Sequence, residues 1–309
     1  MIGTYRLRKK LERRILGLSG WPARALRNPL AFYPPWKKNI LNVARSEGIG
    51  DVLMCTPVLR EARLRNPGGY IRFFTDYPQL VKGLPYIDEV LPMQESPESV
   101  IRLSYEEAVP TKFHLARIMG DCIGIDVDNV TPDCMVQNDL RVLYRNRWGN
   151  TKTIVALISP SKFTPNKEWP IGYWEELFRR ILGKVRVVLV GSGNNYKFNF
   201  DDEMLVDLRS QTSLEDLVAI VSTADLYVGP VSGPFHISAA LGVPSVVIAG
   251  GYELPENTSY EGSVALTRSP VCSPCWLRTE CPYSKKCLAD ILPDEVEKEI
   301  SRLLFSGKI

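Results

Sequence analysis

The sequence predicts an α/β protein with two units, each built around a parallel sheet. Short apolar runs alternate with segments of helical periodicity, and this alternation occurs in two successive series. The chain has 309 residues, which is enough for two domains, and 45% of them are hydrophobic. We expect domains at residues 40–150 and 151–309, preceded by a basic extension at residues 1–39.

The first series begins with an apolar strand at 40–44, followed by a glycine turn and a helix over 48–65. Two β-rich segments at 70–75 and 89–91 come next, and residues 112–123 have the pattern of a helix. Strands joined through helices in this order form a parallel sheet with helices on its faces.

The second series predicts strands at 153–158, 185–190, 225–229 and 245–249, and helices at 171–182, 213–223 and 233–241. Ser213 and Asp216 have the spacing of a helix cap. Two such units are expected to face each other across a cleft. Ligands of α/β proteins bind where the carboxyl ends of the strands meet such a cleft.

A first candidate site follows the strand at 40–44, where Gly48 and Gly50 allow a tight turn into a helix. Asp51 falls in the first helical turn, where the helix dipole keeps a carboxylate ionised. Asp51 is either only a favourable first-turn acid or a base that takes a proton from an attacking hydroxyl.

A second candidate site is the turn at residues 229–236, with Ser232, Gly233 and Pro234 at the start of a helix. Free backbone N–H groups at that end can bind a diphosphate. His236 is either a packed structural residue or part of this site. Lys167, after the first strand of the second series, is either solvated or the counter-ion of a leaving diphosphate.

Four of the seven cysteines lie close together in the loop 272–287: Cys272, Cys275, Cys281 and Cys287. Their spacing suits a tetrahedral thiolate site for zinc or iron, and the alternatives are reduced thiols or an incidental cluster. The nearby Arg278, Lys285 and Lys286 are expected to lower the thiol pKa values.

The extension is strongly basic and carries one acid, Glu12; its basic residues are Arg6, Arg8, Lys9, Lys10, Arg13, Arg14, Arg24, Arg27, Lys37 and Lys38. It is either a strap packed on the body or an interfacial anchor. We expect residues 1–38 to bind an anionic membrane surface, and no nucleic acid partner. No apolar run reaches the roughly 18 residues that span a bilayer, and we expect no secretory signal because the N-terminus lacks a continuous apolar h-region. These features predict a cytoplasmic protein, peripheral at the inner face of the inner membrane.

Five segments in this order resemble the motifs of the heptosyltransferase family, glycosyltransferase family 9: residues 45–59, 85–90, 167–170, 212–215 and 232–244. The resemblance implies a GT-B fold and an inverting mechanism without a catalytic metal. It implies that Asp51 is the general base, that Lys167 neutralises the donor phosphates and that Glu215 holds the ribose. Ser232, Gly233, Pro234 and His236 match the phosphate-side loop. The cysteine loop is similar to a metal-bearing finger found in a subset of the family, which implies a structural ion.

The function implied is transfer of a sugar from a nucleoside-diphosphate donor, ADP-heptose or a related one, to a hydroxyl of a bacterial surface glycan such as the lipopolysaccharide core. Val231 stands where the family has an aspartate that contacts the donor sugar, so other nucleotide sugars stay open. The alternatives are a nucleotide-sugar hydrolase or epimerase of the same fold and a non-catalytic docking protein.

Overall fold

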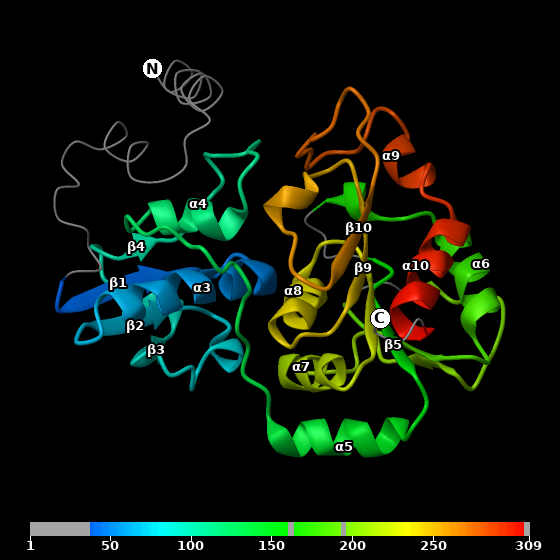
Figure 1. Ribbon diagram of the computed structural model, residues 1–309, viewed down its shortest axis with the longest axis horizontal. Coiled ribbons are helices and arrows are strands. Elements are labelled where there is room, and N and C mark those ends of the chain that lie inside the picture. The colour runs from blue at the N-terminus through cyan, green and yellow to red at the C-terminus, as the bar shows by residue number, and fades with distance from the viewer. Residues whose placement is uncertain (1–37, 160–163, 193–195, 306–309) are drawn as a thin grey trace. The chain divides into compact units, whose positions relative to one another are not determined.

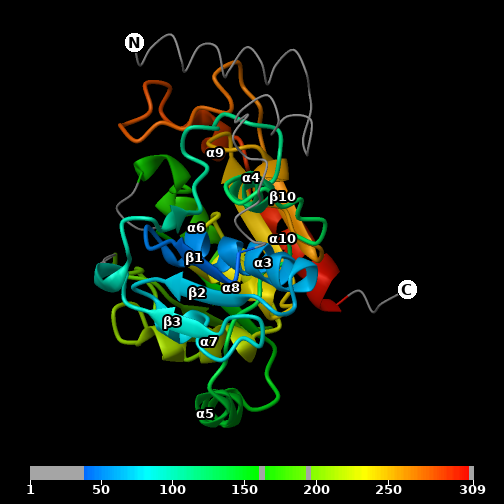
Figure 2. The ribbon, with the colours of Figure 1, turned by 90° about the vertical axis from the view of Figure 1, so that its left-hand side faces the viewer.

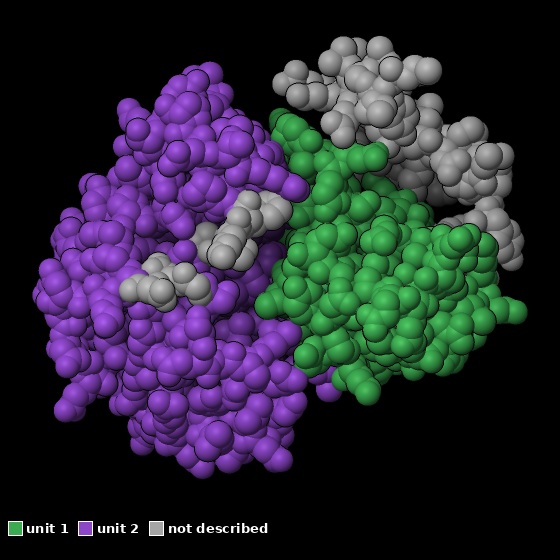
Figure 3. Space-filling model, turned by 180° about the vertical axis from the view of Figure 1, so that it is seen from behind, with its two compact units in different colours: residues 1–130 green, residues 131–309 purple. Residues whose placement is uncertain are grey.

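The computed structural model describes residues 38–159, 164–192 and 196–305. The chain divides into two compact units, residues 1–130 and residues 131–309 (Figure 3). Within the described ranges, no helix is both long enough and apolar enough to cross a membrane. Residues 1–37 of the predicted extension lie outside the described residues.

The first unit contains a parallel sheet, as the β-α-β pattern predicts. It has four strands in the order β3-β2-β1-β4. The strands are β1 (Ile40–Ala44), β2 (Tyr70–Phe74), β3 (Glu89–Leu91) and β4 (Ile101–Arg102). The helices are α3 (Ile49–Arg65) and α4 (Leu115–Asp121), with short 3-10 turns η2 (Pro78–Leu80) and η3 (Met93–Glu95). Helices α3 and α4 pack against each other beside the sheet (Figure 1, Figure 2).

Helix α3 connects β1 to β2 and is buried over most of its length. Its apolar segment from Val52 to Leu59 is fully enclosed, and its exposed end carries Arg63 and Arg65. Basic residues in the last turn interact favourably with the helix dipole. This connection places the N-terminal turn of α3 at the carboxyl end of β1.

The second unit contains a six-stranded parallel sheet with the order β10-β9-β8-β5-β6-β7. Its strands are β5 (Thr153–Ala156), β6 (Arg186–Leu189), β7 (Leu205–Asp207), β8 (Leu226–Gly229), β9 (Ser245–Gly250) and β10 (Ser263–Thr267). Strands β5, β8 and β9 are buried at every position. Such strands are covered on both faces, which explains their nearly continuous apolar sequences.

Helices cover both faces of this sheet (Figure 1). Helices α7 (Leu214–Ser222) and α8 (Gly233–Ala240) lie on one side, and α6 (Ile171–Ile181) and α10 (Pro293–Phe305) on the other, with the short α9 (Lys286–Ala289) near β9. Ser213 caps α7 and Asp216 completes the reciprocal capping box, so the predicted cap is confirmed.

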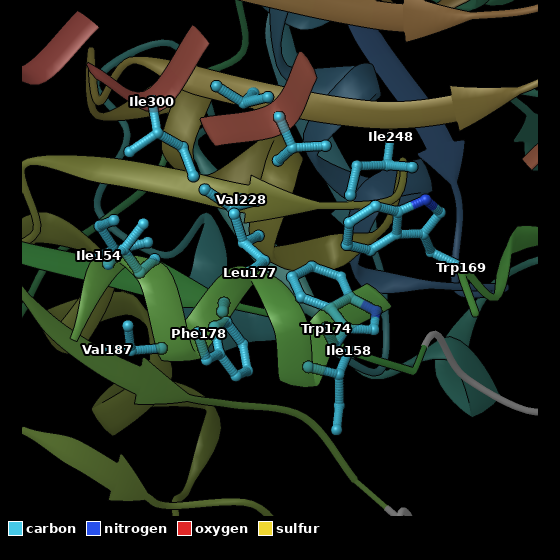
Figure 4. Close-up of a cluster of buried hydrophobic side chains, with 14 of the residues drawn as sticks. Ile154, Ile158, Trp169, Trp174, Leu177, Phe178, Val187, Val228, Ile248 and Ile300 are labelled. Carbon is cyan, nitrogen blue, oxygen red and sulfur yellow. The ribbon is translucent and has the colours of Figure 1, made fainter. Parts of the chain in front are cut away.

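The core between α6, α10 and the sheet is the main apolar cluster of the second unit (Figure 4). Trp174 and Phe178 of α6 face Val228 and Ile248 of the sheet, and Ile300 of α10 closes the cluster. Trp169 meets Trp174 edge to face, with ring centroids 5.0 Å apart. This packing fixes the segment directly after Lys167.

Helix α5 (Asn138–Trp148) belongs to the second unit, whereas the sequence pattern predicts a first domain at residues 40–150. The Tyr144 hydroxyl lies 3.0 Å from Asp216, and the Trp148 indole N–H donates to Thr223 at 3.1 Å. Both contacts join α5 to α7, and they account for the structural division at residue 130 rather than 150.

Candidate functional site

Asp51 lies in the first turn of α3, at the carboxyl end of β1, as the sequence predicts. Its carboxylate is 3.1 Å from the guanidinium of Arg45, the residue that follows β1, and accepts a hydrogen bond from Tyr105. Tyr105 comes from the segment after β4, which pairs directly with β1. Neighbouring parallel strands therefore bring all three side chains to one edge of the sheet.

The electrostatics of this cluster depend on burial and on Arg45. Burial raises the pKa of Asp51, while the charge of Arg45 and the hydrogen bond from Tyr105 act in the opposite direction. Arg45 is only 2% exposed. Burial lowers the pKa of Arg45, but its hydrogen bond to Glu106 and the charge of Asp51 outweigh that effect and raise it. Arg45 also lies 5.0 Å from the centre of the Tyr105 ring. Asp51 is thus a largely enclosed carboxylate in a fixed orientation.

The second unit brings Lys167 and the start of α8 together. Lys167 ends the 3-10 turn η4 (Pro165–Lys167) after β5, and its ammonium donates to the Val231 carbonyl at 3.3 Å. Strands β5 and β8 are neighbours, so the loops that follow them share one edge of the sheet. Ser232 precedes α8 in an extended conformation and does not cap it with its side chain.

His236 and Glu215 have different surroundings. His236 is 3% exposed, and its Nδ1 lies 2.7 Å from the Tyr260 hydroxyl. It is therefore a buried residue of α8, close in sequence to the first-turn residues Gly233 and Pro234. Glu215 is half-buried in the first turn of α7, and α7 packs against α8.

The cysteine loop packs closely against the turn that carries Lys167. The Asn166 amide donates to the carbonyls of Leu277 and Thr279 at 2.9 and 2.7 Å, and the Thr164 hydroxyl donates to Leu277 at 2.8 Å. Asn166 and Thr164 are buried. The Lys285 ammonium reaches the Pro165 carbonyl at 3.3 Å. The two loops thus form one hydrogen-bonded layer.

The glycines at the end of β9 have no side chain, which leaves room for the cysteine loop and α9. Gly250 has a φ of +59°, and a Cβ there would lie 2.7 Å from the Leu288 side chain. A larger residue would be strained in its backbone and would also push α9 away. The Gly250-Gly251 pair therefore allows the cysteine loop to lie against the sheet edge.

All seven cysteines are free thiols. Burial raises the pKa of Cys287, and Cys275, Cys281 and Cys272 raise it further, so the four sulfurs lie within electrostatic range. The expected lowering of thiol pKa values is therefore wrong for Cys287, because burial and the neighbouring thiols outweigh the backbone hydrogen bond from Gly251 that lowers its pKa. Among the described residues, no three His, Cys, Asp or Glu side chains are arranged to hold a metal ion.

Residues 98–272 match glycosyltransferase family 9 (heptosyltransferase), and this stretch covers more than half of the chain. The chain belongs to glycosyltransferase family 9. The matched stretch of this family 9 member contains Lys167, Glu215 and the turn 232–236, whereas Asp51 precedes it.

Two curated relatives are both called lipooligosaccharide heptosyltransferase 2. The protein from Campylobacter jejuni subsp. jejuni serotype O:6 is 25% identical over 166 residues, which cover 50% of this chain and 52% of the relative. The protein from serotype O:2 is 25% identical over 172 residues, covering 52% and 54%. The family 9 chain thus spans about half the length of the curated relatives that it matches.

Solved structures share the fold over most of the family 9 chain. ADP-heptose LPS heptosyltransferase II of E. coli has a TM-score of 0.66 at 18% identity, covering 88% of this chain and 100% of that one. The iron-containing dodecameric glycosyltransferase TibC of enterotoxigenic E. coli has a TM-score of 0.69 at 17% identity, covering 88% and 80%. A family 9 protein from Veillonella parvula has a TM-score of 0.67 at 16% identity, covering 87% and 98%. The predicted GT-B fold class is confirmed.

Several residues that contact the candidate sites have no role assigned from the sequence alone. Arg45 and Tyr105 orient Asp51, Asn166 holds the Lys167 turn, and Glu253 forms an ion pair with Lys167. Glu253 follows β9, the neighbour of β8. The rule that found Lys167 and Ser232, namely position after a parallel strand, could therefore have found Glu253 as well.

Proposed function

We propose that the chain is an inverting glycosyltransferase that moves a heptose, or a related sugar, from a nucleoside-diphosphate donor to a hydroxyl of a bacterial surface glycan such as the lipopolysaccharide core. Membership of family 9 carries this proposal. The curated relatives are named as heptosyltransferases, and the E. coli structure is named for ADP-heptose. ADP-heptose is accordingly the first donor to test.

The acceptor side of the reaction is assigned to Asp51. Its ionised carboxylate takes the proton of the acceptor hydroxyl while that oxygen attacks the anomeric carbon of the donor sugar. The bond between the anomeric carbon and the phosphate oxygen breaks, and the diphosphate leaves with the electron pair. Arg45 and Tyr105 keep the carboxylate oriented and favour its charged form.

The donor side is assigned to the second unit. The Lys167 ammonium and the backbone N–H of Gly233, at the start of α8, stabilise the negative charge that grows on the leaving diphosphate. Glu215, in the first turn of α7, accepts hydrogen bonds from the ribose hydroxyls. His236 supports the helix start from inside, through its contact with Tyr260.

The decisive experiment replaces the proposed base. Asp51→Asn should lower the turnover number by about two to four orders of magnitude, because proton transfer loses its acceptor. Calorimetry with ADP should show unchanged affinity. Glu47→Gln is the matched control, since Glu47 also pairs with Arg45 but its side chain is 50% exposed. Wild-type turnover in Asp51→Asn would remove Asp51 from the mechanism.

We further propose that Cys272, Cys275, Cys281 and Cys287 bind one structural zinc or iron ion. The support is the donor set, four thiols on one short loop, and TibC is named as iron-containing. Elemental analysis of untagged protein should find about one ion per chain, and Cys275→Ser should lower that content. Cys134→Ser, which removes a thiol outside the loop, should not. Metal-free wild-type protein of full stability would contradict the site.

We also propose that the protein works in the cytoplasm, peripheral at the inner face of the inner membrane, with residues 1–38 on an anionic lipid surface. The basic composition of that segment supports this proposal. A glycolipid acceptor would be presented at the same surface.

A further inference from the structure

Glu253 is a buried acid at the edge of the second sheet. Its residue exposure is 4%, and among the described side chains that are buried it is the one carboxylate. It lies in the segment after β9, next to the turn after β8 that leads into α8. A carboxylate in such a position needs a charged or hydrogen-bonding partner.

Its partner is the lysine assigned to the donor phosphates. The Glu253 carboxylate is 2.5 Å from the Lys167 ammonium, and the two side chains are only 5% and 14% exposed. The same ammonium donates to the Val231 carbonyl at 3.3 Å and lies 4.7 Å from the centre of the Tyr252 ring. Lys167 is therefore fixed from three sides, and Glu253 balances its charge.

Three neighbouring strands bring these groups to one place. Lys167 follows β5, Val231 follows β8 and Glu253 follows β9, and these strands are adjacent in the sheet. The carboxyl edge of a parallel sheet is where such folds bind ligands. Beside Glu253 a small pocket is lined mainly by apolar groups, among them Val231, Phe235, Leu254 and Pro255.

The two charged groups suit different parts of a nucleotide sugar, the diphosphate and the sugar hydroxyls. A carboxylate repels phosphate oxygens but accepts hydrogen bonds from hydroxyl groups, and an ammonium attracts phosphate. A buried ion pair adds little net stability over apolar side chains, so stability alone does not account for Glu253.

We infer that Glu253 is a specificity-determining residue that accepts hydrogen bonds from hydroxyl groups of the donor sugar, while Lys167 holds the diphosphate. This inference rests on the proposed function. In this chain the apolar Val231 supplies only its backbone carbonyl, and the acidic side chain comes from the next loop. The donor is therefore a polyhydroxylated sugar whose hydroxyls reach the segment after β9.

The test compares two ligands on the full chain. Glu253→Gln should weaken binding of ADP-heptose by about tenfold, because a charged hydrogen-bond acceptor is lost. Binding of ADP should become tighter, because Lys167 loses its counter-charge and ADP carries no donor sugar for Glu253 to bind. Glu256→Gln is the matched control, since Glu256 is an exposed acid of the same loop, and it should change neither affinity. Isothermal titration calorimetry measures all the affinities.

The opposite direction of the two changes separates sugar recognition from a structural role. If Glu253→Gln weakens ADP and ADP-heptose equally, Glu253 only supports Lys167 and the inference is overturned. If that variant does not fold, Glu253→Asp keeps the charge and shortens the reach, and it should weaken ADP-heptose alone. Wild-type protein that binds neither ADP nor any nucleotide sugar of a panel would contradict the proposed function itself.

Discussion

At the residue scale, the reactivity of Asp51 depends on opposing influences. Enclosure by the protein favours the protonated acid, whereas Arg45 and Tyr105 favour the carboxylate. As the proposed general base, Asp51 must be ionised, so we expect activity to fall as the pH drops through its pKa. Because the pKa of Asp51 is raised, the acidic limb of the pH–rate profile should lie at a higher pH than the usual pKa of an exposed aspartate.

Tyr105→Phe tests this balance with a small change. The variant loses the hydroxyl that donates to Asp51, and with it one influence that lowers the pKa of this carboxyl. The acidic limb of kcat/KM should therefore move to higher pH, with little change well above it. A pH series of initial rates measures the limb, and Tyr70→Phe, at an exposed tyrosine of β2, is the control. An unmoved limb would show that another group controls the profile.

At the scale of elements, the cysteine loop and the Lys167 turn form a unit that the sequence separates by over one hundred positions. The buried side chains of Asn166 and Thr164 donate hydrogen bonds to backbone carbonyls of the loop. Tyr252 contacts Lys167 on one side and the Trp276 ring on the other, with ring centroids 5.4 Å apart. The cysteine loop therefore holds the Lys167 turn in place through these contacts.

Asn166→Ala should release that support. The Thr279 carbonyl loses this donor, and the Leu277 carbonyl keeps only the hydrogen bond from Thr164. We expect ADP affinity to fall by about tenfold, with the KM for the donor rising more than the turnover number falls. Arg268→Gln is the comparison, because Arg268 fixes the start of the loop to Glu295 of α10 and touches neither Asn166 nor Lys167. Equal losses of ADP affinity in both variants would indicate general loosening instead.

Most long elements could be predicted because their patterns are local. The helix of residues 171–182 and the strands at 153–158 and 245–249 have clear apolar periodicity or buried runs, and each is present. Strand β4 has two residues, too few for any period. Helix α10 was not predicted, although its amphipathic pattern was available.

The candidate site was predictable only in part, for a physical reason. Asp51 and Lys167 follow strands, and the end of a parallel strand is a position that sequence reveals. Their partners are set by strand order, which sequence does not reveal: Tyr105 reaches Asp51 only because β4 lies beside β1. Glu253 meets Lys167 because β8 alone separates β9 from β5.

At the scale of the whole molecule, charge is divided unevenly along the chain. The formal net charge is +3, yet residues 1–39 hold ten of the 38 lysines and arginines and one acid, so the rest of the chain is net acidic. An acidic body is repelled by anionic lipid. Any attraction to such a surface must therefore come from the N-terminal segment.

Deletion of residues 1–36 should therefore abolish sedimentation with anionic vesicles. Each basic residue near such a surface contributes about 1 kcal/mol, screened by salt. The full chain should bind phosphatidylserine vesicles at low salt and release them at high salt, and neutral vesicles are the control. Circular dichroism verifies that the shortened protein folds. Equal binding by both proteins would contradict the membrane proposal.

The ion pair between Lys167 and Glu253 has a consequence for competition among cellular anions. A bare lysine beside a helix start would attract inorganic phosphate and nucleoside triphosphates, which are abundant in cells. The pair carries no net charge, so a simple anion gains little there and must also displace or tolerate the carboxylate. A ligand with a donor sugar attached to its diphosphate satisfies both partners, since the hydroxyls of that sugar can donate to the carboxylate. On the proposed assignment, free nucleotides should therefore compete only weakly with the donor at this site.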